Sequence, residues 1–128
     1  MKRPIKFRGR LLNSDVWVFG YLQVFNERAY IKTGEHHSRF GMGFEVDPNT
    51  VGQYTGINDK TGCEIFEGDL VDLDGWNPKT YQISFIEAGF CLAWHGKSET
   101  FREGEFVADI HYVQHAREPR ATVVGNIY

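Results

Sequence analysis

Along much of the chain, apolar residues recur at every second position, and the apolar runs are separated by Gly, Asn and Asp. A period of two is typical of half-buried strands, because successive side chains of a strand point to opposite faces. The polar residues and glycines between the runs indicate tight turns. The pattern therefore predicts an antiparallel domain of mainly β structure, β-rich α+β at most.

The first strands are predicted to form a hairpin. Apolar and basic side chains alternate from Ile5 to Leu11, residues 13–15 are Asn-Ser-Asp and suit a turn, and an apolar strand resumes at Val16. Residues 81–94 predict a second hairpin around a glycine-containing loop. Shorter strands are predicted within residues 51–55, 65–66, 70–74 and 122–127.

The strand from Val16 to Leu22 is apolar on both faces. Trp17, Phe19 and Tyr21 point to one side, and aliphatic side chains point to the other. Such a strand is either buried on both sides or covered by a partner chain. We therefore expect the protein to self-associate through β surfaces as a homo-oligomer.

Two segments lack a clear strand pattern. Residues 32–43 are polar and rich in glycine, which predicts an exposed loop. In residues 105–117, Phe106, Ile110 and Val113 have helical spacing, but Ala108, Ile110 and Tyr112 fit a strand almost as well. Both alternatives stay open for that segment.

With 128 residues, the chain has the size of one domain, and we expect residues 1–128 to form a single one. No stretch approaches the ~20 apolar residues that span a bilayer, and the basic start lacks a signal-peptide core. A cytoplasmic protein without membrane contact is therefore expected. Cys63 and Cys91 lack the number and spacing of a disulfide framework or zinc site, so both are expected to be free thiols.

Charge is distributed unevenly along the chain. Residues 1–56 carry eight Lys and Arg against five Asp and Glu, a net +3, whereas residues 57–128 carry six against twelve, a net −6. The asymmetry bears on partners rather than on fold. Lys6, Arg8 and Arg10 project from one face of the first strand, where they are expected to be exposed and suit contacts with successive phosphates. The aromatic residues of the neighbouring strand suit stacking on bases, although aromatic residues more often fill cores.

Two glycine-containing turns are predicted between residues 58 and 69. Asp59 and Gly62 suit the first, and the Glu67-Gly68-Asp69 corner suits the second, with Gly68 at positive φ and Asp69 accepting hydrogen bonds from nearby backbone N–H groups. This interpretation makes all four residues architectural.

Metal binding is the functional alternative for the acidic residues near these turns. It would need oxygen ligands from several carboxylates that strand alternation scatters over both faces: Glu64, Glu67, Asp69, Asp72 and Asp74. Histidines offer a second alternative through the adjacent His36 and His37 or the pair His111 and His115, but no zinc-enzyme motif accompanies them. No nucleophile elbow, phosphate loop or dinucleotide fingerprint is present. We predict no metal, no cofactor and no enzymatic activity.

Four ordered motifs resemble the YopX family of bacteriophages and prophages. They lie at residues 5–8, 46–56, 59–71 and 123–128, so the resemblance spans nearly the whole chain. It implies a fold of several coiled β-sheets that includes an SH3-like barrel, and a family without an established enzymatic activity. The chain departs from the pattern at Gly9-Arg10, where many relatives have an aromatic and an acidic residue.

Three functional hypotheses follow. The first is a non-enzymatic binding or assembly module of phage or prophage origin in a bacterial host cell. The second is a nucleic-acid-binding accessory protein that uses Lys6, Arg8 and Arg10. The third, a metal-assisted hydrolase, depends on the histidines and carboxylates alone.

Overall fold

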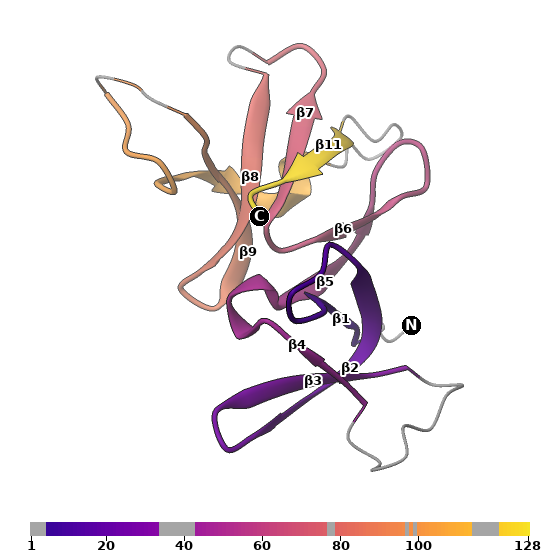
Figure 1. Cartoon of the computed structure of the whole chain (residues 1–128). Helices are drawn as coiled ribbons and strands as arrows, with labels where there is room; N and C mark the ends of the chain where they lie inside the picture. Colours follow the sequence, from indigo (N-terminus) through magenta and orange to yellow (C-terminus); the bar gives the residue numbers. More distant parts are fainter. Residues whose placement is uncertain (1–4, 34–42, 77–78, 97, 99, 114–120) are drawn as a thin grey trace. The chain divides into compact units, whose positions relative to one another are not determined.

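The computed structural model describes residues 5–33, 43–76, 79–96, 98, 100–113 and 121–128 (Figure 1). The chain divides into two compact units, Met1–Tyr54 and Thr55–Tyr128. The single domain predicted for residues 1–128 stays a prediction. It can be tested by measuring whether the two units unfold together or separately.

The first unit consists of antiparallel strands and one turn of 3-10 helix. These elements are β1 (Phe7–Arg10), β2 (Trp17–Phe25), β3 (Arg28–Lys32), β4 (Phe44–Val46), the 3-10 helix η1 (Pro48–Thr50) and the beginning of β5 (Gly52–Asn58). The strands follow the hydrogen-bonded order β4-β3-β2-β1-β5. β1 is therefore paired on both sides and is not an edge strand.

The first predicted hairpin is confirmed. β1 pairs with the beginning of β2, so that Arg8 lies opposite Phe19. The turn is closed by a hydrogen bond of 2.9 Å from Leu11 N to Val16 O. Asn13 has a φ of 55° there, in the left-handed region that Asn tolerates better than most residues.

One face of β2 contributes to the core of the first unit. Val18 and Leu22 pack against the buried Ala29, Ile31 and Val46, which come from β3 and β4. This burial removes apolar surface from water and so stabilises the pairing of the three strands. Among the described residues, this face of β2 is packed in a core, whereas Phe19, Tyr21 and Phe25 of the other face are exposed.

The second unit contains the end of β5 and a further antiparallel sheet. Its other elements are β6 (Glu64–Phe66), β7 (Asp69–Leu73), β8 (Thr80–Ile86), β9 (Gly89–Trp94), β10 (Phe106–Asp109), the 3-10 helix η2 (Ile110–Val113) and β11 (Ala121–Asn126). The five-stranded sheet has the order β10-β9-β8-β7-β11. The hairpin predicted for residues 81–94 is confirmed by the pairing of β8 with β9.

The core of the second unit lies on one face of this sheet. Its buried members are Ile65, Val71, Leu73, Tyr81, Ile83, Leu92, Val113 and Ala121. They alternate with more exposed residues along β7 and β8, as the period of two predicts.

Mainly β structure is confirmed. Every pairing found between the described strands is antiparallel, and the helices there are the short η1 and η2. Neither strand order closes into a barrel, so the SH3-like barrel stays an expectation from the family resemblance. Within residues 105–117, the described part forms β10 followed by η2. Most of the loop predicted for residues 32–43 lies outside the described residues.

A helix suited to crossing a membrane, both long and apolar, is not found among the described residues.

Candidate functional site

Basic and aromatic side chains share one face of β1 and β2. Arg8 lies opposite Phe19 and Arg10 opposite Trp17, and side chains of directly opposed residues point to the same side of an antiparallel pair. The Arg8 guanidinium carbon lies 4.7 Å from the centroid of the Trp17 ring, within the range of a cation–π interaction. Lys6 Nζ lies 5.6 Å from the Tyr54 ring.

Aromatic surface, more than charge, is accessible on this face. Arg8 is only 7% exposed, which contradicts the expectation of an exposed cation, because β1 is a central strand and Arg8 packs on Trp17. Lys6 and Arg10 are partly buried. By contrast, three aromatic side chains of β2 on this face are 46%, 64% and 56% exposed; they are Phe19, Tyr21 and Phe25, here called the β2 aromatic face.

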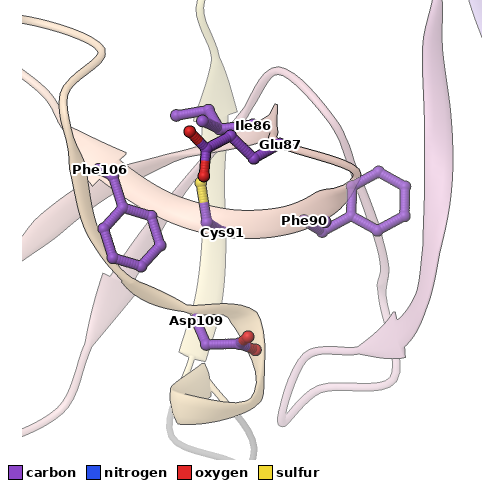
Figure 2. Close-up of a pocket in the computed structure, with 7 residues that line it drawn as sticks. Ile86, Glu87, Phe90, Cys91, Phe106 and Asp109 are labelled. Carbon is purple, nitrogen blue, oxygen red and sulfur yellow. The ribbon is translucent and has the colours of Figure 1, made fainter.

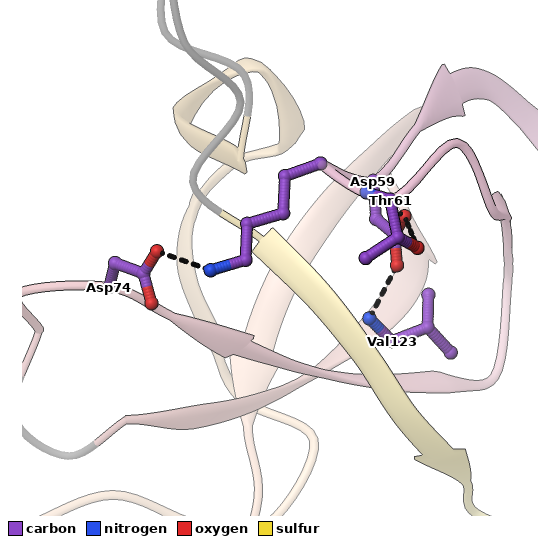
Figure 3. Close-up of polar contacts among 5 residues, drawn as sticks. Asp59, Thr61, Asp74 and Val123 are labelled. Atoms are coloured by element: carbon purple, nitrogen blue, oxygen red, sulfur yellow. Dashed lines mark hydrogen bonds and ion pairs between the residues drawn. The ribbon is translucent and has the colours of Figure 1, made fainter.

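Asp59 connects the turn between β5 and β6 to β11. Its Oδ1 accepts hydrogen bonds from Thr61 N at 2.8 Å, Thr61 Oγ1 at 2.6 Å and Cys63 N at 2.9 Å. Its Oδ2 accepts one from Val123 N at 2.9 Å (Figure 3). The side chain is buried, and both oxygens are occupied by donors of the protein itself.

Burial raises the pKa of Asp59, but the hydrogen bonds from Thr61, Val123 and Cys63 outweigh burial and hold the pKa below its ordinary value of 3.8. The carboxylate is therefore ionised at neutral pH. Next to it, Lys60 pairs with Asp74 at 2.9 Å (Figure 3). This exposed ion pair contributes little to stability.

Of the other predicted turn residues, Gly62 and Gly68 lie in tight turns, and Asp69 begins β7 directly after the second turn. Gly62 has a φ of 90°, and its N–H donates to Asp59 O at 3.0 Å. Gly68 has a φ of 93°, and its N–H donates to Ile83 O at 2.8 Å. Beside it, the buried Asp69 accepts a hydrogen bond of 2.8 Å from Phe66 N. The four residues thus hold the backbone of the second unit in place.

The acidic residues near these turns have separate protein partners. Asp72 accepts a hydrogen bond from Thr80 Oγ1, and Asp74 pairs with Lys60. Within the described part of the chain, no group of three or more His, Cys, Asp or Glu comes together as a metal site would require. The histidines predicted as alternative ligands cannot be placed in a site: His36, His37 and His115 lie outside the described residues, and the side chain of His111 does too.

A pocket of about 380 Å³ lies on the β8–β9–β10 part of the second unit (Figure 2). It is lined by Ile86, Glu87, Gly89, Phe90, Cys91, Phe106 and Asp109. Both cysteines are free thiols, as expected, and Cys91 is buried whereas Cys63 is exposed. Burial, with the nearby Asp109 carboxylate, raises the pKa of Cys91, so the thiol stays neutral at physiological pH.

This pocket was not predicted from the sequence, because Cys91 was expected only to be a free thiol and residues 105–117, with Phe106 and Asp109, were left open between helix and strand. A usable signal was Gly89, a residue without a side chain at the start of an otherwise bulky strand.

A family model described as YopX protein covers residues 6–128. A comparison with curated proteins finds no match.

Proposed function

The chain belongs to the YopX family, and we propose that it is a non-enzymatic binding or assembly module of phage origin. Membership of this family fits a phage-type protein. The module acts in the cytoplasm of a bacterial host and associates with further copies of itself through the β2 aromatic face.

The exposure of the β2 aromatic face carries this proposal. Phe19 and Tyr21 are two positions apart, and Phe25 follows after Gln23, so all three aromatic side chains lie on one face of a single strand. Large apolar side chains gathered on one exposed face are typical of protein interaction sites, whereas single ones are common on any surface. A second copy offers an identical row, and the same patch on both subunits is the commonest way in which homodimers form.

The proposal concerns the face of the strand rather than its edge. Residues 17–20 of β2 pair with β1 and residues 21–25 pair with β3, whereas Phe19, Tyr21 and Phe25 project from the face of the strand. Sheets that stack face to face lie about 10 Å apart, with interdigitating side chains. Aromatic side chains bury large areas in such packing.

Sedimentation equilibrium of the full chain tests the proposal. We expect a mass above that of a monomer, and we expect the double variant Phe19→Thr/Tyr21→Thr to sediment as a monomer with an unchanged circular dichroism spectrum. Val124→Thr is the control, because Val124 is an exposed apolar strand residue of the second unit. A wild-type protein that stays monomeric at high concentration contradicts the proposal.

Nucleic-acid binding is the second candidate, favoured by the register of β1 and β2. This register puts Arg10 opposite Trp17, so a partly exposed cation and stacking surfaces occur on one face. A nucleic acid would use both the cation and the aromatic surface: its phosphates would pair with Arg10, and its bases would stack on Tyr21 or Phe19. Against this candidate, Arg8 is buried and already stacked, which leaves fewer cations for phosphates.

Binding of a labelled single-stranded oligonucleotide at increasing salt tests this candidate. For two phosphate contacts, by Lys6 and Arg10, the slope of log K against log salt should be about −1.4 to −1.8, at roughly 0.7–0.9 per phosphate. The double variant Lys6→Ala/Arg10→Ala should flatten that slope. The absence of binding at low salt would exclude the candidate.

A further inference from the structure

The pocket on β8, β9 and β10 lies on the sheet face opposite the core of the second unit. Cys91 is paired with Ser84 of β8 and with Asp109 of β10, so these three side chains point to one face. Leu92, the next residue of β9, is part of the core and points the other way. The pocket is therefore separate from the packing that stabilises the unit.

An irregularity in β10 brings an aromatic ring and a carboxylate together in the pocket. Phe106 is paired with Ala93 and Asp109 with Cys91, and the register shifts between Phe106 and Ala108. In a regular strand, residues three apart point to opposite faces. Because the register shift adds one residue to β10, as a β-bulge does, the side chains of Phe106 and Asp109 point to the same face of the sheet.

The hollow itself is due to Gly89. This residue lies opposite Ile86, on the face that carries Cys91, and it supplies no side chain there. A Cβ atom added at Gly89 would meet only the Ile86 carbonyl oxygen, at 4.0 Å. The space that a larger residue would fill is thus open.

The chemistry of the lining defines a complementary ligand. Both charged residues of the lining, Glu87 and Asp109, are acidic and exposed, and Cys91 is neutral. Phe106 is 53% exposed, and its aromatic ring lines the same pocket (Figure 2). A cation attached to an apolar stem matches this combination, because the carboxylates attract the charge and the ring packs on the stem or on a planar cation.

We propose that this pocket binds the guanidinium group and the methylene stem of an arginine side chain of a partner protein. The planar guanidinium stacks on the Phe106 ring and pairs with the Glu87 and Asp109 carboxylates, whereas an ammonium group makes neither a planar stack nor a bidentate pair. The proposal is independent of the β2 aromatic face, since the two sites share no residue.

Fluorescence anisotropy with a labelled short peptide tests the proposal on the full chain. The probe has one arginine between leucines, and the control peptide has citrulline, which is neutral and of nearly the same shape, in its place. We expect a dissociation constant of about 1 mM or tighter for the arginine peptide. The citrulline and lysine peptides should bind at least about tenfold and about threefold more weakly, respectively. Equal binding of the arginine and citrulline peptides would overturn the proposal, and a lysine peptide that binds as well would overturn the choice of arginine.

Variants of the chain locate the binding. Gly89→Val should abolish binding by filling the hollow, whereas Gly125→Val, at another strand glycine with open space around it, should leave binding unchanged. Asp109→Asn should weaken binding about threefold to tenfold. Because this position is exposed, the variant is expected to fold, and it serves as the test if Gly89→Val does not fold. Unchanged affinity in a folded Gly89→Val or in Asp109→Asn would show that arginine binds elsewhere.

Discussion

One side chain, Asp59, ties two segments of the second unit together, because its carboxylate accepts hydrogen bonds from the β5–β6 turn and from Val123 of β11. We expect Asp59→Asn to lower the free energy of unfolding by about 2–4 kcal/mol, since an amide replaces one acceptor oxygen with a donor and leaves a buried N–H without a partner. Urea denaturation at pH 7 measures the loss. The exposed Asp74→Asn is the control and should change stability by less than about 1 kcal/mol.

The same carboxylate should make stability depend on pH. Because the pKa of Asp59 is lower in the folded protein than its ordinary value of 3.8, the unfolded chain takes up the proton first as the pH falls. The stabilisation by Asp59 is therefore fully present above pH 3.8 and is lost as the pH falls through the folded pKa. Thermal unfolding between pH 2 and 6 should show a shallower acid loss for Asp59→Asn than for the wild type. Parallel curves would mean that Asp59 has an ordinary pKa.

Substitutions at Gly62 and Gly68 distinguish the cost of backbone strain from the cost of a steric clash. Both have φ near 90°, but only at Gly68 would the new Cβ meet another group, Cε2 of Tyr128 at 2.7 Å. Gly62→Ala should therefore cost about 1 kcal/mol through backbone strain, and Gly68→Ala about 1–3 kcal/mol. Denaturant unfolding of the two variants compares these costs. An unchanged stability for Gly68→Ala would show that the corner adjusts freely.

At the scale of elements, β1 illustrates what a central position does to a basic strand. Arg8 is 7% exposed and lies over Trp17, so Arg8→Ala removes both a cation–π interaction and the packing of the methylene stem. We expect a loss of about 1–2 kcal/mol in the free energy of unfolding. Arg28→Ala is the matched control, with a side chain 66% exposed and a loose 3.8 Å ion pair, and should change stability by less than about 0.5 kcal/mol. Equal effects would mean that Arg8 is not held in the sheet.

The strands could be predicted from the sequence because their pattern is local. The alternation before Leu11 and the turn near Asn13 predicted the β1–β2 hairpin, and residues 81–94 predicted β8 and β9. What alternation cannot give is which strand lies in the middle of a sheet. The exposure of Arg8 was therefore wrongly predicted, since it depends on pairing with β5, more than 40 residues along the chain.

Gly89 marks the hollow of the pocket in the sequence, but the full lining could not be predicted, for a similar reason. It requires Phe106 and Asp109 to lie on the face of Cys91, and that depends on one register shift between β9 and β10. A bulge changes the facing of a strand without leaving a distinct residue type in the sequence. The turn residues, by contrast, were identified correctly as turn-formers, because the demand for positive φ at Gly62 and Gly68 is a local property.

At the scale of the whole molecule, the two units differ in the size of their cores. The first has a small buried cluster of Ala29, Ile31 and Val46, whereas the second buries a larger set that includes Leu73, Ile83 and Leu92. Since burial of apolar side chains is the main favourable term in folding, a unit with the smaller core opens more easily if it can unfold by itself.

Native-state hydrogen exchange distinguishes independent units from the single domain predicted for residues 1–128. If the units open separately, the slowest amides of β2 and β3 should exchange at least about tenfold faster than those of β8 and β9, a difference of about 1.4 kcal/mol in opening free energy. Leu92→Ala should then speed exchange in β8 and β9 by a large factor and leave β2 and β3 unchanged, because its cavity lies in the core of the second unit. Val46→Ala is the reciprocal variant in the first unit. If both variants instead accelerate the slowest amides of both units equally, the chain unfolds as one cooperative domain, and the two units are parts of a single folding event.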